Sequence, residues 1–204
     1  MANDTSEHLR SGHFYVPWSN EEDRTTLGKA LALDVAEARG EPLTVLTALK
    51  SDAEEHDEFK GLTIVSERDG VIPDGGVVLA WCPTLKAMEK TYQLRASTLV
   101  VVEWSSPRLS GWAKLNDARN AVTSELMTSG LRNDGRQLLH EIVQEGYRGW
   151  HDSIAYRRTE ALISDLRKLG QYDRSVVLAY ARQARGRRGI GNLKRVLDAA
   201  ATAE

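Results

Sequence analysis

The chain has 204 residues, of which 41% are hydrophobic and 27% are charged. This composition is typical of a globular protein that is long enough to bury a core, and it argues against a disordered chain. Cys82 is the single cysteine, which excludes an intrachain disulfide and a zinc site built from thiolates. The five histidines show no paired ligand spacing, so we expect no structural metal.

The net charge of −2 conceals an uneven distribution of charge along the chain. Residues 1–150 carry 16 Lys/Arg against 23 Asp/Glu, whereas residues 151–195 carry 11 Lys/Arg against 4 Asp/Glu. Such asymmetry is typical either of a nucleic-acid-binding surface or of two lobes that attract each other.

The N-terminal segment, residues 1–12, is a polar tail without the apolar run of a secretory signal. No apolar stretch approaches the roughly 20 residues that a transmembrane helix requires. We therefore expect a cytoplasmic protein with no membrane partner.

Residues 13–110 alternate between strand and helix patterns. A short strand is predicted at residues 13–16, where Pro17 ends it. Ser19 and Glu22 have the spacing of a capping box, which predicts that a helix begins there and stops at Gly40.

Further strands are predicted from short apolar or β-branched runs at residues 43–47, 62–65, 77–81 and 98–102. Another helix is predicted over residues 83–95. Apolar strands that alternate with helices predict an α/β domain at residues 13–110 with a mostly parallel, Rossmann-like or flavodoxin-like sheet and helices on both faces.

After Trp104 the strand pattern disappears. We expect residues 111–204 to form a helical C-terminal lobe, with a basic segment at residues 157–195. Helices are predicted over residues 111–127, after Asp134, from Asp152 to Leu169, from Asp173 onward, and after Gly191-Asn192.

Ligands of open parallel sheets bind outside the carboxyl ends of the strands, where helix N-termini attract anions. Three segments are predicted at that edge, residues 17–20, 81–84 and 103–106. Their candidate ligand-binding residues are Trp18, Ser19, Asn20, Cys82, Thr84, Trp104 and Ser105. We therefore predict binding of a small anionic ligand, a nucleotide or another phosphate-containing molecule. Helix capping by Ser19 and Thr84, and tryptophans that belong to the core, explain several of these residues equally well. The chain has no glycine-rich phosphate-binding motif, and nothing in it identifies a cofactor or a reaction.

Glu103 is the candidate catalytic residue, because a carboxylate at the end of an apolar strand needs water or a partner and could act as a general base. The alternative is that Glu103 reaches solvent at the sheet edge or pairs with Arg108. For Cys82 a nucleophilic role competes with burial in the core, where free cysteines are common.

The basic segment supports a second prediction, contact with nucleic acid through the side chains of Arg182, Arg185, Arg187, Arg188, Lys194 and Arg195. Gly189-Ile190-Gly191 resembles the turn of helix-hairpin-helix DNA-binding modules, although Arg195 stands where that motif usually has a small apolar residue. A solvated helix surface that is attracted to the acidic sheet domain would explain the same arginines without nucleic acid.

Overall fold

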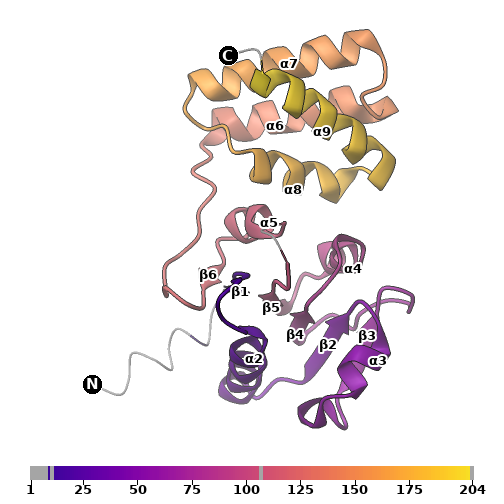
Figure 1. Ribbon diagram of the computed structural model, residues 1–204. Coiled ribbons are helices and arrows are strands. Elements are labelled where there is room, and N and C mark those ends of the chain that lie inside the picture. Colours follow the sequence, from indigo (N-terminus) through magenta and orange to yellow (C-terminus); the bar gives the residue numbers. More distant parts are fainter. Residues whose placement is uncertain (1–8, 10–11, 106–107, 203–204) are drawn as a thin grey trace. The chain divides into compact units, whose positions relative to one another are not determined.

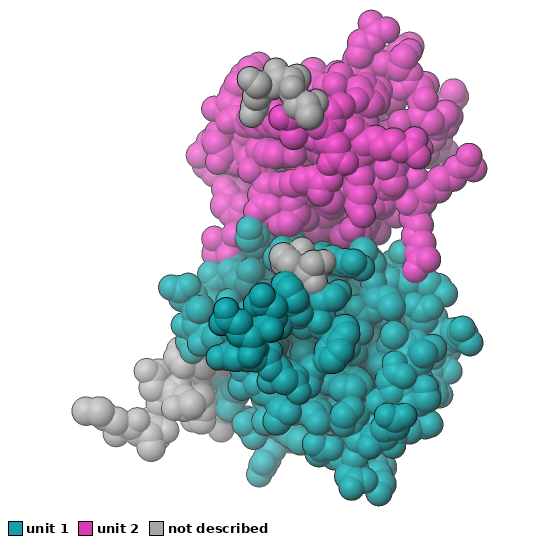
Figure 2. Space-filling model, viewed as in Figure 1, with its two compact units in different colours: residues 1–127 teal, residues 128–204 magenta. Residues whose placement is uncertain are grey.

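The chain divides into two compact units, residues 1–127 and residues 128–204, which we call the sheet unit and the helical unit (Figure 2). The computed structural model describes residues 9, 12–105 and 108–202 (Figure 1). The sheet unit extends past the boundary that we predicted at residue 110, because helix α5 (Ser110–Leu115) connects two strands of one sheet.

The sheet unit is built on a six-stranded sheet in the order β3-β2-β4-β5-β1-β6, and all of its strand pairs are parallel. Counted from β2, the first five places follow the flavodoxin-like order 2-1-3-4-5, with the first strand of the chain in the fifth place. The parallel α/β fold is thereby confirmed. The strands are β1 (Phe14–Val16), β2 (Leu43–Thr47), β3 (Thr63–Ser66), β4 (Gly76–Trp81), β5 (Ser97–Val102) and β6 (Arg119–Asn120).

Helices cover both faces of this sheet (Figure 1). Two hydrophobic clusters form the core, one on each face, and neighbouring strand residues such as Leu79 and Ala80 belong to opposite clusters. This burial on both sides is why the strands read as continuous apolar runs. One face carries α2 (Thr25–Arg39), α3 (Lys50–Glu54) and the 3-10 turn η1 (Asp57–Phe59), and the other carries α4 (Leu85–Met88), the 3-10 helix η2 (Glu89–Gln93) and α5.

Helix α2 packs closely on β5 because it contains Gly28. A Cβ atom at this position would lie 2.1 Å from a methyl carbon of Val102, so any other residue would push the helix away from the sheet. The predicted helix stop is confirmed, since Gly40 adopts the left-handed conformation with φ 64°. The predicted start near Ser19 is wrong, because the first residue of the helix is Thr25.

The predicted helix over residues 111–127 is correct only as far as Leu115. The chain then forms β6, whose Arg119 N–H donates to His13 O at 2.8 Å, and Ala121 N–H donates to Tyr15 O at 2.9 Å. These backbone hydrogen bonds to β1 replace the ones that a longer helix would have made. Non-local pairing therefore outweighs the helical spacing of the apolar residues in this segment.

The helical unit follows the predicted helices in the main. The helices predicted from Asp152 and Asp173 begin there, and each aspartate caps its helix. Asp134, after which we predicted a helix, lies within the first helical turn and not before it. Among the described residues no helix combines the length and apolar character that crossing a membrane requires. The elements are α6 (Asn133–Glu145), the 3-10 helix η3 (Gly146–Arg148), α7 (Ser153–Lys168), α8 (Arg174–Ala184) and α9 (Arg187–Thr202).

The glycines that we assigned to a hairpin turn lie inside α9, so the predicted turn at residues 189–191 is wrong. The chain between α8 and α9 is Arg185-Gly186 instead. Gly189 faces the indole of Trp150, and a Cβ atom there would lie 3.4 Å from the ring. The small residue thus permits close packing of α9 on the segment after η3.

The half-buried histidine His13 makes folding sensitive to pH. Its Nδ1 accepts a hydrogen bond from Leu99 N–H at 3.1 Å, which requires an unprotonated Nδ1 atom. Burial, assisted by the positive charge of Arg39, lowers the pKa of His13 below its ordinary value.

We predict that the free energy of unfolding decreases as the pH falls below about 6.5, the ordinary pKa of histidine. In that range the unfolded chain binds a proton that the folded chain does not accept until its lower pKa is reached. Urea unfolding at pH 7.5 and pH 5.5 measures the difference. His13→Asn keeps an acceptor near the position of Nδ1 but does not titrate, so its loss of stability should be smaller. An equal loss in both proteins would contradict this account.

Candidate functional site

The predicted ligand-binding segments meet at one edge of the sheet. Val16 of β1 pairs with Val102 of β5, and Trp81 of β4 pairs with the same Val102, all in parallel register. The chain therefore leaves these three strands at the same carboxyl edge, as we expected from the sequence. Ser106, the last residue of the third predicted segment, lies outside the described residues.

At two places along this edge, the connections that follow two neighbouring strands run to opposite faces of the sheet. From β1 the chain continues to α2 on one face, whereas from the adjacent β5 it continues to α5 on the other. The same divergence separates β2, which leads to α3, from β4, which leads to α4. Such switch points open a crevice between the diverging connections, and ligands of α/β proteins bind there.

Two exposed tryptophans stand at the β1/β5 switch point. Trp18 and Trp104 each follow the paired residues Val16 and Val102 by two positions, and Glu103 N–H continues the ladder by donating to Val16 O at 3.0 Å. Their exposed fractions are 40% for Trp18 and 66% for Trp104, whereas Trp81 is only 7% exposed. The edge therefore presents two large aromatic side chains to solvent, while Trp81 belongs to the core.

Glu103, the residue before Trp104, is buried. Its Oε2 accepts a hydrogen bond from the hydroxyl of Tyr15, and its Oε1 accepts from the backbone N–H groups of Arg108 and, at 2.8 Å, Leu109. The carboxylate thus joins β1 to the connection between β5 and α5. The pairing that we considered with Arg108 exists through its backbone and not through its guanidinium group.

Burial dominates the electrostatics of this pair. It raises the pKa of Glu103 above its ordinary value, although the hydrogen bonds from Tyr15 and from the two backbone amides act in the opposite direction. Burial and the neighbouring carboxylate also raise the pKa of Tyr15 far above its usual range. A general base needs a lone pair directed at its substrate, whereas both Glu103 oxygens already accept hydrogen bonds from the protein.

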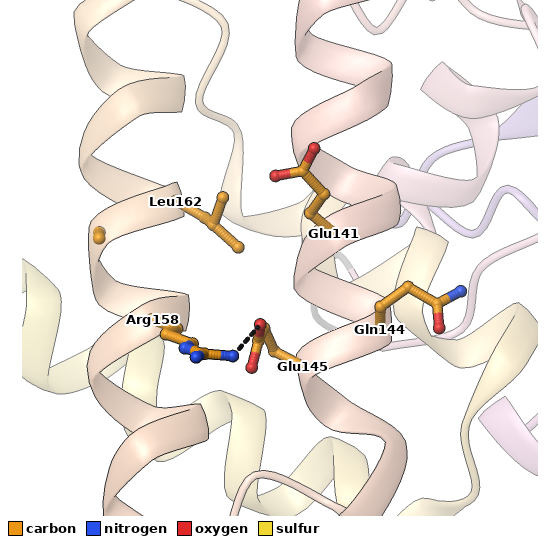
Figure 3. A pocket seen from close by; sticks show the side chains of 6 residues that line it. Glu141, Gln144, Glu145, Arg158 and Leu162 are labelled. Atoms are coloured by element: carbon orange, nitrogen blue, oxygen red, sulfur yellow. Dashed lines mark hydrogen bonds and ion pairs between the residues drawn. The ribbon is translucent and has the colours of Figure 1, made fainter.

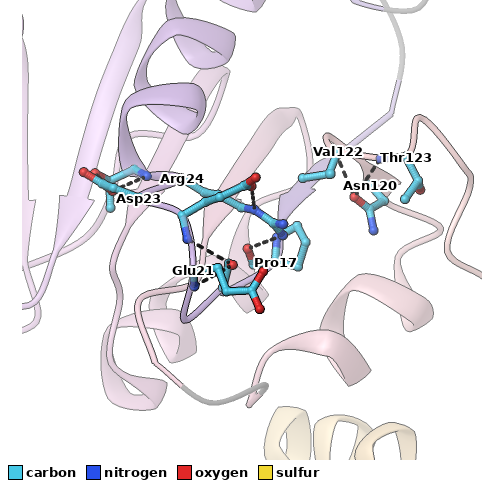
Figure 4. Close-up of polar contacts among 10 residues, drawn as sticks. Pro17, Glu21, Asp23, Arg24, Asn120, Val122 and Thr123 are labelled. Carbon is cyan, nitrogen blue, oxygen red and sulfur yellow. Dashed lines mark hydrogen bonds and ion pairs between the residues drawn. The ribbon is translucent and has the colours of Figure 1, made fainter.

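The connection from β1 to α2 is held by local hydrogen bonds (Figure 4). Ser19 Oγ accepts from the backbone N–H groups of Glu21 and Glu22 at 3.2 and 3.3 Å, so it stabilises a turn before the helix. Asp23 accepts from Thr25 N–H at 2.9 Å and thereby supplies a hydrogen bond at the start of α2. Asn20 is exposed next to Ser19.

Arg24 lies beside Trp18 in the same connection. Its guanidinium group donates to Pro17 O at 3.4 Å and pairs with Glu22 at 3.1 Å (Figure 4). On the β6 side, Asn120 Oδ1 accepts from Val122 N–H at 2.9 Å and closes a tight turn. Ser105 is exposed after Trp104.

At the end of β4, Thr84 caps α4 by accepting from Ala87 N–H at 3.0 Å, as one of our two interpretations predicted. Its hydroxyl also donates to Glu67 at 2.7 Å. Cys82 is half-buried with a left-handed backbone, φ 48°. Burial and, to a lesser degree, Asp23 and Asp52 raise the pKa of its thiol to about 12. Cys82 is therefore a neutral thiol near pH 7, which disfavours a nucleophilic role.

The β2/β4 switch point contains a polar group that we did not anticipate. Trp81 Nε1 is buried and has no hydrogen-bond partner, and the ring of His56 meets the indole edge-on with centroids 4.6 Å apart. Lys29 Nζ lies 3.5 Å from His56 Nδ1 and 2.9 Å from Glu58. Lys29 is buried at a helical position that local sequence gives no reason to single out.

In the helical unit the predicted basic residues differ in their environment. Arg185 donates to Val143 O at 2.8 Å and is half-buried, and Arg182 is half-buried on α8. The remaining four residues are exposed on α9, and they are Arg187, Arg188, Lys194 and Arg195.

A shallow pocket of about 330 Å³ lies between α6 and α7 (Figure 3). Glu145 and Arg158 form an ion pair at 3.3 Å across it, and the aliphatic side chain of Leu162 lines one side. The pocket is open to solvent, and its lining has one carboxylate, that of Glu141, in excess of the Glu145–Arg158 ion pair.

Comparison of the chain with protein-family models, with curated proteins and with solved structures found no significant match. Functional inference therefore depends on the geometry and chemistry of the chain itself.

We predict that Tyr15→Phe lowers the free energy of unfolding by about 1–3 kcal/mol, because it leaves a buried Glu103 oxygen without its donor. Urea unfolding followed by circular dichroism measures the loss. In the matched double variant with Glu103→Gln, the cost of removing the Tyr15 hydroxyl should be smaller, since no charge remains to be stabilised. A Tyr15→Phe protein as stable as the wild type would disprove the proposed role of this hydrogen bond.

We also predict that Cys82 reacts slowly with iodoacetamide. At pH 8 the native protein should be alkylated at least about tenfold more slowly than the urea-unfolded chain, because the raised pKa and partial burial suppress the thiolate. Mass spectrometry of timed samples gives both rates. Equal rates would show that Cys82 is an exposed and ordinary thiol.

Proposed function

We propose that the sheet unit binds a small anionic ligand of the nucleotide class at the carboxyl edge, where β1 and β5 send the chain to opposite faces. The observation that carries this proposal is the pair of exposed tryptophans, Trp18 and Trp104, at matching positions beyond two adjacent strands. The β1/β5 switch point lies at the same place, and ligands of α/β proteins bind at such points.

The aromatic pair supports recognition of a planar ring. Large aromatic side chains gain free energy when their faces are covered, and stacking of one base on one aromatic side chain contributes about 1–3 kcal/mol. Trp18 and Trp104 are exposed while the tryptophans at positions 81, 112 and 150 are buried. The edge thus offers stacking surface that the core of the protein does not use.

Two arginines lie near the aromatic pair along the chain, and guanidinium groups suit a phosphate group. Arg24 donates to Pro17 O next to Trp18, and the exposed Arg108 follows Trp104 closely in the chain. Glu21 and Glu22 lie in the same connection as Arg24, so the edge is not strongly positive. This balance favours a ligand that combines one ring with one or a few phosphates over a large polyanion.

The proposal is limited to binding. Glu103, which we considered as a general base, is engaged on both oxygens by Tyr15 and two backbone amides. In this proposal the carboxylate positions the connection that bears Trp104, and no chemical step is assigned to it.

Tryptophan fluorescence tests the proposal directly, because Trp18 and Trp104 are the exposed indoles among the described residues. We predict that AMP or ATP quenches the emission excited at 295 nm in a saturable manner, and that ribose 5-phosphate, which lacks a base, quenches much less. Trp104→Ala should weaken binding by roughly tenfold or more, in keeping with the loss of one stacking surface.

The control for that variant is Val71→Ala, which truncates another exposed apolar side chain of the sheet unit. It should leave nucleotide binding unchanged. Failure of every nucleotide to quench at millimolar concentration, or equal weakening by Val71→Ala, would refute the proposed site.

A further inference from the structure

Helix α9 has two faces of opposite character. Its apolar side chains, including Ile190, Leu193 and Val196, are buried within the helical unit. The side chains that are exposed between positions 187 and 195 recur at the spacing that places residues on one side of an α-helix. They belong to Arg187, Arg188, Lys194 and Arg195, with Gly191 at the centre of the same stripe. We call these five residues the basic face.

The cations of the basic face have no acidic partner among the described residues. Several other arginines of the helical unit are engaged: Arg185 binds Val143 O, Arg158 pairs with Glu145, and Arg174 pairs with Asp198. Arg148 is exposed next to the basic face, because Asn192 Nδ2 donates to Gly149 O at 2.6 Å and joins this segment to α9. Among the described residues, four cations without an acidic partner therefore share one side of α9.

The helix dipole makes this placement unfavourable unless an anion is present. Arg187 and Arg188 occupy the first turn of α9, which contains no acidic residue. The N-terminus of a helix carries partial positive charge, so cations there are destabilising and anions are stabilising. A bound phosphate would reverse the sign of the interaction.

Gly191 gives the basic face a flat centre. No heavy atom lies within 4 Å of the position that its Cβ atom would occupy, so packing does not explain the glycine. Glycine also weakens a helix relative to alanine. Gly189, by contrast, packs against Trp150. A glycine between four cations allows the sugar-phosphate backbone to approach the helix closely.

We infer that the basic face of α9 is a contact surface for the phosphate backbone of nucleic acid. Arginine forks bind phosphate oxygens in pairs, and such contacts are independent of base sequence. This surface lies entirely in the helical unit, so the inference is independent of the nucleotide site that we propose in the sheet unit.

The test uses the full chain and fluorescence anisotropy with a labelled 20-base-pair duplex and a labelled single-stranded RNA. Binding should be measurable at 50 mM NaCl and should weaken linearly in log–log form as the salt concentration rises. The double variant R188E/R195E should weaken binding at least about tenfold and should reduce the slope by about 2, since roughly 0.9 counterions are released per phosphate contact.

The matched control is R136E/R157E, which makes the same change of charge at exposed positions of α6 and α7. It should retain most of the affinity and the slope. Equal loss in both double variants would show a general effect of charge and would overturn the assignment to α9.

Gly191 provides a readout that a purely structural role would not give. Gly191→Ala should raise the thermal stability of the protein, because alanine favours the helix, and at the same time weaken nucleic-acid binding. Gly191→Glu should abolish measurable binding at 50 mM NaCl. No binding by the wild-type chain at this salt concentration, binding that is insensitive to salt, or salt-sensitive self-association in place of nucleic-acid binding would each overturn the inference.

Discussion

Strand β1 lies between β5 and β6, and the backbone hydrogen bonds that hold it there determine the arrangement of the carboxyl edge. Because Val16 is level with Val102, the chain leaves two adjacent strands at the same height and turns to opposite faces. Trp18 and Trp104 then emerge together, and Tyr15 comes within hydrogen-bonding distance of Glu103. A shift of β1 by one residue would turn its side chains to the opposite faces of the sheet. It would remove both the matching positions of the two tryptophans and the hydrogen bond from Tyr15 to Glu103.

The two units of the chain differ in their electrostatic character. Residues 1–127 contain 13 Lys/Arg and 20 Asp/Glu, and residues 128–204 contain 14 Lys/Arg and 9 Asp/Glu. The positive balance of the helical unit supports the proposed contact with a long polyanion, and the negative balance of the sheet unit opposes such a contact there. A small ligand is affected mainly by the few charges next to it, because salt screens interactions beyond roughly 8 Å under physiological conditions. The two proposals thus assign anions of very different size to the two units.

Local sequence was sufficient to predict the buried strands and several helix ends. Strands β2, β4 and β5 are buried throughout and mostly apolar because helices cover both faces. Gly40 and Asp152 carry local signals of a helix end and a helix start. The two-residue strand β6 has no such pattern, since it exists only through its pairing with β1. Prediction failed where a distant partner determined the local conformation.

The candidate site shows the same division. The position of Glu103 at the end of an apolar strand was visible in the sequence, but its partner Tyr15 is 88 residues away and carries no local mark. The exposed cations of α9 were predicted as part of a larger basic group. The structure shows that Arg185 has a structural role, because it donates to Val143 O. It also shows that Gly191 lies within α9, so that the four exposed cations belong to one helix.

The insertion of β1 also determines when the sheet can be completed. As the chain emerges from the ribosome, β2, β3 and β4 can pair with one another as soon as they are made, because they are neighbours in the sheet. The first strand has to wait, since its partners β5 and β6 begin only at Ser97 and Arg119. Closing so long a loop is slow. During synthesis the apolar residues of the N-terminal strand therefore remain uncovered until β5 is made, and only the edge strand β6, which pairs with β1, joins the sheet after it.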